Sequence, residues 1–151
     1  MAKIDLNRKT LPRFIERVQL IKADTPRQWG KMDAARAVRH LIYTLELSLG
    51  IEKVENRVHP VVGALLYFAF NQVITTWPKG MKGPDYLTPL PKHDFASEKE
   101  QLVHLITQFV NELERNPTRI EVNPSLGAIT LAKWSRAHGV HMDHHLRQFG
   151  V

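Results

Sequence analysis

The chain has 151 residues, of which 43% are hydrophobic and 24% are charged. This length and composition predict one soluble domain over residues 1–151 and exclude a disordered chain. The chain has no cysteine, which excludes disulfides, thiolate metal sites, iron–sulfur clusters and a cysteine nucleophile. It has eight histidines, and four of them fall within the last fourteen residues. A transition-metal site would therefore have to use histidine with Asp, Glu or water.

The basic excess of the chain lies in its N-terminal third. The chain carries 21 Lys and Arg against 15 Asp and Glu, and residues 1–39 hold ten of the basic and four of the acidic side chains. Such an excess can mark a nucleic-acid surface, because it attracts phosphates. Solvated helix faces are the favoured interpretation, since no recognition motif accompanies the charge. The first suspects for a nucleic-acid contact are Arg13, Arg17, Arg36 and Arg39.

No targeting or membrane segment is visible in the sequence. The first ten residues are polar and contain no apolar stretch of the kind found in signal peptides. The longest apolar run covers residues 61–70, whereas a membrane-spanning helix needs about twenty residues. We therefore expect a cytoplasmic protein that does not enter a membrane.

Capping signals predict helices over residues 10–22 and 33–49. Thr10 and Asp33 stand where N-cap side chains are expected, and Gly50 stands just after the second helix. A third helix is predicted from His59 and its following proline to about residue 77. Its first half is apolar all round, which indicates burial by the core or by a partner subunit.

The second half of the chain alternates loops and helices. A proline-rich stretch over residues 78–95 is long enough to be a crossover, a lid or a functional loop. Ser97 and Glu100 form a capping box for a helix that ends near residue 115. After a loop at residues 123–127, Thr130 caps a last helix that runs to residue 148. With no convincing strand, the prediction is all-α: a four-helix bundle with an additional or broken helical segment and a long proline-rich loop.

The histidines of the last helix do not all share one face. At about 100° per residue, one arc of about 80° faces inward. His141 and His145 are i, i+4 neighbours in this arc and can converge on one point, whereas His144 falls to one side. A pair of core-edge histidines satisfied by ordinary hydrogen bonds is the alternative, and helical spacing alone leaves it open. The members of the arc are Trp134, His138, His141, His145 and Gln148.

A metal site needs a third ligand, and spacing alone does not select one. His104 lies on the polar side of its helix, so we expect it to be solvated. His59 and His93 lie at a helix start and in a loop, where nothing anchors them. His40 lies outside the main apolar arc of its helix, on a narrow stripe of small and polar residues that includes Thr44 and that could line a polar cavity.

Two sequence blocks resemble the DinB/YfiT-like metalloenzyme superfamily. Residues 29–32 (Trp-Gly-Lys-Met) and residues 37–41 (Ala-Val-Arg-His-Leu) resemble its second-helix region. Trp134 and residues 141–150 are similar to its C-terminal histidine motif, and closer still to a bacterial branch of unknown function. The loop at residues 123–127 also fits that branch, although Asn123 stands where the pattern usually has histidine. The resemblance covers the chain from about residue 10 to its end.

The resemblance implies a four-helix bundle in which three histidines bind a divalent metal, usually zinc or nickel. Carried over position by position, these are His40, His141 and His145. Some superfamily members are thiol S-transferases that use low-molecular-weight thiols such as bacillithiol or mycothiol, and relatives are often dimers. Others, including the bacterial branch of unknown function, have no known activity. The resemblance therefore implies a metal-dependent transferase or hydrolase whose reaction is not assigned, with a low-molecular-weight thiol and a small electrophile as candidate partners and a homodimer as its assembly.

Three imidazoles on one metal leave a position open to a thiol or to water, as in catalytic zinc sites. No general base can be named. The residues expected around the metal, as pocket or supporting contacts, are Trp29, Thr44, Trp134 and Gln148. The alternative function is a non-enzymatic helical module that acts through its basic N-terminal third or an apolar face.

Overall fold

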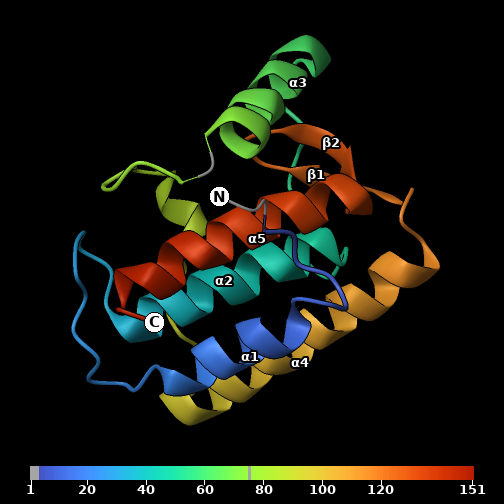
Figure 1. Cartoon of the computed structure of the whole chain (residues 1–151). Coiled ribbons are helices and arrows are strands. Elements are labelled where there is room, and N and C mark those ends of the chain that lie inside the picture. The colour runs from blue at the N-terminus through green and yellow to red at the C-terminus, as the bar shows by residue number, and fades with distance from the viewer. Residues whose placement is uncertain (1–3, 75) are drawn as a thin grey trace.

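The computed structural model describes residues 4–74 and 76–151. Residues 1–3, part of the predicted polar N-terminus, and residue 75, within the predicted third helix, lie outside the described residues. The described chain forms five α-helices, two short helices of other types and two strands (Figure 1). In chain order these are α1 (Leu11–Leu20), α2 (Ala34–Ser48), α3 (Pro60–Phe68), the π-helix η1 (Ala69–Val73), the 3-10 helix η2 (Asp85–Leu87), α4 (Phe95–Arg115), β1 (Ile120–Asn123), β2 (Gly127–Thr130) and α5 (Leu131–Gln148).

Four of the helices surround the hydrophobic core. In Figure 1, α2 lies beside α5 and α1 lies beside α4, while α2 also packs on α4 and α1 on α5. Each of these helices buries one face, and the side chains on these faces meet in the middle. The largest fully buried side chains include Phe14, Ile42, Phe109, Trp134 and Met142. This frame places α2 and α5 side by side.

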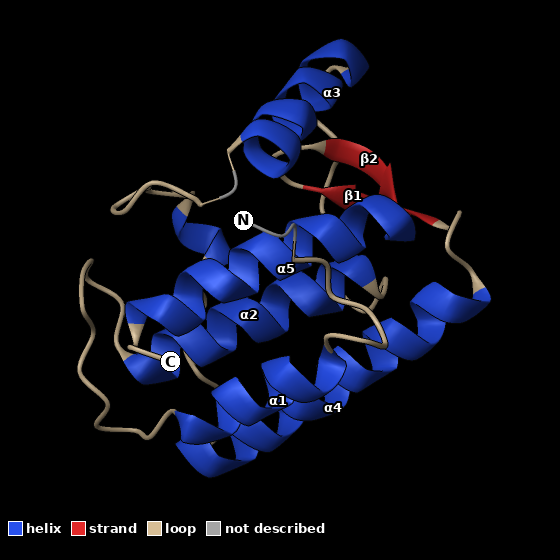
Figure 2. Ribbon diagram, in the orientation of Figure 1, coloured by secondary structure: helices blue, strands red, loops and turns tan. Residues whose placement is uncertain are grey.

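A two-stranded antiparallel sheet shows that the all-α prediction is wrong. β1 and β2 pair in register, with Ile120 opposite Thr130 and Asn123 opposite Gly127 (Figure 2). The fold is therefore a mixed one, in which the five described helices accompany a β-hairpin. The Asn123 side chain accepts hydrogen bonds from the backbone N–H groups of Ser125 and Leu126, at 2.9 and 3.1 Å, and thereby forms the turn. The predicted loop at residues 123–127 is thus the tip of a hairpin.

Side-chain caps fix the starts of α2 and α5 as predicted. Asp33 accepts a hydrogen bond from the backbone N–H of Arg36 at 2.8 Å, and Thr130 accepts one from that of Lys133 at 3.3 Å. Gly50 has a φ of 72° directly beyond the end of α2, where a left-handed residue is expected. These two helices carry the candidate histidines.

The predicted capping box at the start of α4 is wrong. The helix begins at Phe95, two residues before Ser97, and Asp94 is its N-cap. The carboxylate of Asp94 accepts hydrogen bonds from the Ser97 backbone N–H at 3.0 Å and from the Ser97 hydroxyl at 2.7 Å. A carboxylate at a helix N-terminus also interacts favourably with the helix dipole, which explains the earlier start.

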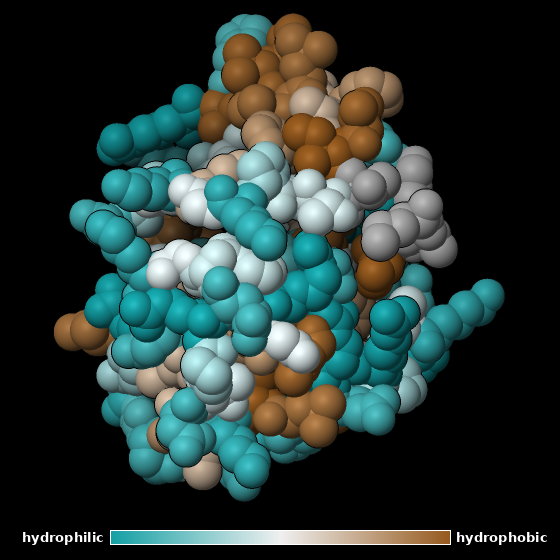
Figure 3. Space-filling model, turned by 60° about the vertical axis from the view of Figure 1, so that its left-hand side comes forward, coloured by the Kyte–Doolittle hydropathy of each residue, from teal (hydrophilic) through white to brown (hydrophobic). Residues whose placement is uncertain are grey.

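The third helix differs from its prediction in length and in burial. The α-helix ends at Phe68 and continues as the π-helix η1 to Val73, so the predicted regular helix to residue 77 is wrong. Burial by the core of this chain is also wrong: Gly63 is the one buried residue of α3. Apolar side chains gather on this exposed helix (Figure 3): Val61, Val62, Leu65 and Phe68. None of the helices in the described part of the chain has the length and apolar character that crossing a lipid bilayer requires.

Candidate metal centre

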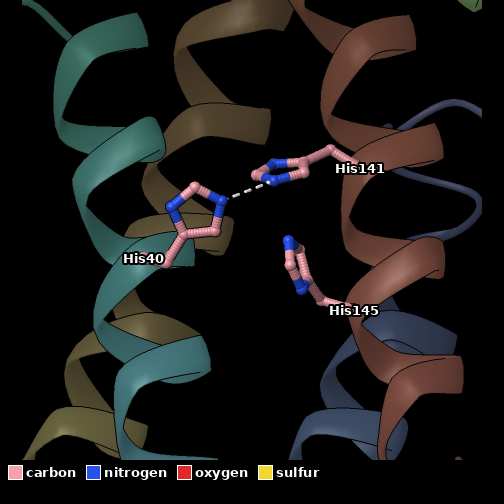
Figure 4. A group of neighbouring side chains, drawn as sticks. All are labelled: His40, His141 and His145. Carbon is pink, nitrogen blue, oxygen red and sulfur yellow. Dashed lines mark hydrogen bonds between the residues drawn. The ribbon is translucent and has the colours of Figure 1, made fainter. Parts of the chain in front are cut away.

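Three histidines from two helices meet between α2 and α5. His40 projects from the middle of α2, and His141 and His145 project toward it from successive turns of α5 (Figure 4). One ring nitrogen from each side chain lies within 4.8 Å of the others. The Nε2 atoms of His40 and His141 are 2.8 Å apart. All three residues are at least nine-tenths buried, with 8%, 8% and 9% of their surface exposed.

A backbone carbonyl fixes the protonation pattern of His40. The Nδ1 atom of its ring lies against the carbonyl oxygen of Leu87, which is the last residue of η2. Because a carbonyl can only accept, the proton of neutral His40 resides on Nδ1. The lone pair of His40 is therefore on Nε2, the atom that faces His141. This is the arrangement of a metal-binding histidine supported by a second-sphere carbonyl.

A side-chain amide fixes the protonation pattern of His145 in the same way. The Nδ1 atom of His145 lies 3.0 Å from Oε1 of Gln148, and Nε2 of Gln148 donates to the carbonyl oxygen of Trp29 at 3.0 Å. The Trp29 carbonyl fixes the orientation of the amide, so that its oxygen must face His145. His145 therefore carries its proton on Nδ1 and its lone pair on Nε2.

Burial keeps the three rings neutral. It lowers the pKa of His40, lowers that of His141 well below its usual value, and lowers that of His145 to about 3. Mutual repulsion among the rings lowers the pKa of His141 and His145 further, because each protonated imidazole would face another. Neutral imidazoles with free lone pairs are the form that binds a divalent metal.

The donor set fits zinc or nickel. Two nitrogens bound to one zinc ion at 2.0–2.1 Å lie no more than about 4.2 Å apart. The histidine nitrogens, which lie within 4.8 Å of one another, would have to move slightly closer to bind one ion. Imidazole suits both zinc and nickel. The cluster therefore has the ligand type and charge state that a divalent transition metal needs, and its spacing is close to that of a bound site.

Residues 1–150 match the protein family described as "Protein of unknown function (DUF1569)". The chain belongs to this family. This confirms the predicted relation to a domain of unknown function, and the family description assigns no activity. No curated protein and no solved structure matches the chain.

In this family member, two further buried histidines lie near the cluster, and the ring centroid of His144 is 5.1 Å from that of His145. His138 shares the predicted inward arc, but its Nε2 atom contacts the Ser48 hydroxyl at 2.8 Å and its ring stacks on Trp134. The residue is fully surrounded by the core, which satisfies it by ordinary hydrogen bonding. His144 is also buried, and Nδ1 of its ring has no hydrogen-bond partner among the described residues. The exposed histidines are His59, His93 and His104.

A cavity of about 320 Å³ adjoins the three histidines. Thr44 and Trp134, two of the four predicted surrounding residues, line it. The other two, Trp29 and Gln148, support the histidines from behind through the hydrogen bonds described above. Gln148 contacts His145 directly through its amide oxygen.

The proline-rich loop at residues 78–95 forms one wall of the cavity. It contributes apolar and small residues to the lining and places the Leu87 carbonyl against His40. Sequence reasoning missed Leu87, because a backbone carbonyl carries no signal in the residue type. The lining residues from this loop are Met81, Lys82, Gly83, Pro84, Leu87 and Thr88.

Internal contacts hold most of the basic side chains suspected of binding nucleic acid. Arg39 is 1% exposed and pairs with Glu46 at 2.7 Å. Arg17 pairs with Asp143 at 2.9 Å, and Arg36 donates to a backbone carbonyl in the loop over residues 78–95. Buried and paired guanidinium groups are poorly placed to reach phosphates, which weakens the basis for that interpretation.

Proposed function

We propose that this protein is a metal-dependent enzyme that binds one zinc or nickel ion through His40, His141 and His145. The observation that carries the proposal is the hydrogen bonding behind the rings. The Leu87 carbonyl oxygen and the Gln148 amide oxygen each accept a hydrogen bond from the Nδ1–H group of one histidine, so that two Nε2 lone pairs face the space shared with His141.

The reaction that we propose is transfer of a low-molecular-weight thiol to a small electrophile. When bound, the ion would lower the pKa of a thiol or a water molecule in its open position. The chain has no thiol of its own, which suits an enzyme that takes its thiol from a cosubstrate. The three-histidine pattern also supports a relation to the DinB/YfiT-like superfamily. The residues of this chain would hold the ion and shield the reacting groups from bulk water within the cavity.

Metal content tests the proposal directly. Purified protein is incubated with zinc or nickel, desalted and analysed for metal, alongside His40→Ala, His141→Ala and His145→Ala. We expect about one ion per chain for the wild type and large losses in all three variants. His104→Ala, which changes an exposed histidine on α4, is the matched control and should bind as the wild type does. Wild-type protein that remains free of both metals would refute the proposal.

We also propose a homodimer that buries the exposed apolar side chains of α3. A contiguous exposed apolar surface is unusual on a monomer and typically marks an interface. Helix α3 carries no charged side chain with which a polar partner could pair. Two copies related by a twofold axis would bury this uncharged surface against itself.

A further inference from the structure

The turn that places the Leu87 carbonyl against His40 lies at the end of an exposed stretch of chain. Residues 78–86, which lead into it, are all exposed. The backbone N–H of Thr88 donates to the Asp85 carbonyl at 3.0 Å, which closes the turn of η2 but does not tie it to the rest of the chain. A segment with few buried contacts opens readily unless specific bonds hold it. The position of the Leu87 carbonyl therefore depends on contacts from outside the loop.

Two side chains on one face of α2 hydrogen-bond to this turn. Nη2 of Arg36 donates to the Thr88 carbonyl at 3.0 Å, and the ring of His40, one helical turn later, contacts the carbonyl of Leu87. Because residues four apart lie on the same side of a helix, the two bonds hold consecutive carbonyls against α2. The guanidinium of Arg36 is always charged and always a donor, so its bond does not depend on the state of His40.

The place of Arg36 within α2 is unfavourable for the helix itself. Its backbone N–H donates to the Asp33 cap, so the residue stands in the first turn of α2. A positive charge in the first turn opposes the helix dipole. A guanidinium is, however, a stronger donor to a carbonyl than a neutral group is. The contribution of this side chain is therefore to the loop rather than to the helix.

We propose that Arg36 is a positioning residue for the metal centre, because its bond to Thr88 keeps the Leu87 carbonyl on Nδ1 of His40. Without this bond the turn leaves α2 for part of the time, and the Nδ1 proton of His40 then lacks its acceptor. The ring can then take the other tautomer, in which Nε2 carries the proton and cannot bind a metal. The consequence for metal binding rests on the proposed function, whereas the effect on the tautomer of His40 does not.

The tautomer of His40 in metal-free protein tests this role at neutral pH. NMR correlation of ring protons with ring nitrogens distinguishes protonated from unprotonated nitrogens, and the signals of His40 are those lost in His40→Ala. In the wild type we expect the proton on Nδ1. In Arg36→Met, which keeps an aliphatic chain but removes the donor, we expect a mixture of the two tautomers. Arg36→Lys keeps a donor and should restore the wild-type tautomer in part, and Arg13→Met, at an exposed position on α1, should match the wild type.

Zinc affinity gives a second readout, in which charge and positioning act in opposite directions. Removal of a positive charge near a bound cation should, through electrostatics alone, tighten zinc binding. Loss of positioning should instead weaken it. We expect zinc affinity to fall about threefold to tenfold in Arg36→Met, as the loss of one hydrogen bond supplies, and to stay unchanged in Arg13→Met. Competition with a chromophoric chelator measures these affinities.

The outcomes separate this proposal from that of the metal site. An unprotonated Nδ1 on His40 of the wild type would overturn the positioning role even if both variants of Arg36 fail to fold. A folded Arg36→Met that keeps the wild-type tautomer, or that binds zinc more tightly, would also overturn it. If the tautomers mix in Arg36→Met but the wild type binds no metal, the positioning role stands and the metal proposal fails. If the wild type binds zinc and the tautomer is unchanged in Arg36→Met, the reverse holds.

Discussion

The supporting hydrogen bonds determine what the three histidines can do. A neutral imidazole has two tautomers, and only the one with its proton on Nδ1 presents Nε2 as a ligand. The Leu87 carbonyl selects this tautomer in His40, and the Gln148 amide selects it in His145. The rings of His40 and His145 are therefore oriented and carry their protons on Nδ1 before a metal arrives, and less freedom is lost on binding.

Replacing the amide of Gln148 should weaken metal binding without unfolding the protein. In Gln148→Leu, neither the orientation nor the tautomer of His145 is fixed, and we expect zinc affinity to fall about 10- to 100-fold. Competition with a chromophoric chelator measures this affinity. Gln108→Leu, which makes the same change at an exposed position on α4, should leave it unchanged. Unaltered affinity in Gln148→Leu would show that the amide has no supporting role.

At the residue scale, the sequence predicted the pair on α5 better than its partner on α2. His141 and His145 stand one helical turn apart, and the structure places them on the same side of α5, facing α2. His138 was in the same predicted arc, yet it is enclosed by Trp134 and Ser48. Only the resemblance identified His40 as a candidate ligand. Periodicity did not, because the side of α2 that carries His40 and faces α5 is a narrow stripe and is not the apolar stripe of this helix.

At the element scale, the caps of α2 and α5 were predictable and the hairpin was not. A cap is a local interaction between residues three positions apart, so Asp33 and Thr130 are visible in the sequence. Each strand has only four residues, which is too short for its alternation to stand out. The exposure of α3 was also invisible, since an apolar helix does not reveal whether its own chain covers it.

Helix α5 approaches the N-terminal segment so closely that one position admits no side chain. A Cβ atom on Gly139 would lie 2.0 Å from the backbone oxygen of Ile4. We therefore expect Gly139→Ala to destabilise the protein by about 1–3 kcal/mol, although alanine is intrinsically the better helix former. Ala132→Gly, at an exposed position on the same helix, should cost about 1 kcal/mol through propensity alone. Chemical denaturation measures both, and a stabilising Gly139→Ala would contradict the close approach.

A charge on α3 should disrupt the proposed dimer. Leu65 is 65% exposed on α3, and Leu20 is 59% exposed on α1. Light scattering should give a mass near twice that of the chain for the wild type and a monomer for Leu65→Glu, because the dimer would bury the new carboxylate. Leu20→Glu adds the same charge outside the proposed interface and should remain a dimer. A monomeric wild type would exclude the interface.

On the scale of the whole molecule, most of the titratable residues in the interior are histidines. His40, His138, His141, His144 and His145 are all buried, and burial lowers the pKa of each. Five of the eight histidines are therefore not a surface feature of a basic protein. These five are kept neutral by the fold, and its stability must depend on pH in a definite direction.

The lowered pKa of His138 gives the direction of this pH dependence and the pH range in which it acts. Burial lowers it from 6.5 to about 3, so between these values the unfolded chain binds a proton that the folded chain does not. The free energy of unfolding should therefore fall as the pH drops below about 6.5, with His138 contributing up to about 1.4 kcal/mol per pH unit. Urea denaturation of chelator-treated protein between pH 7 and pH 5 measures this slope. His138→Gln should reduce the slope, because the amide can still donate to Ser48 but does not titrate, whereas His104→Gln should retain it. An unchanged slope in His138→Gln would mean that the pKa of His138 is not lowered, because water reaches this part of the core.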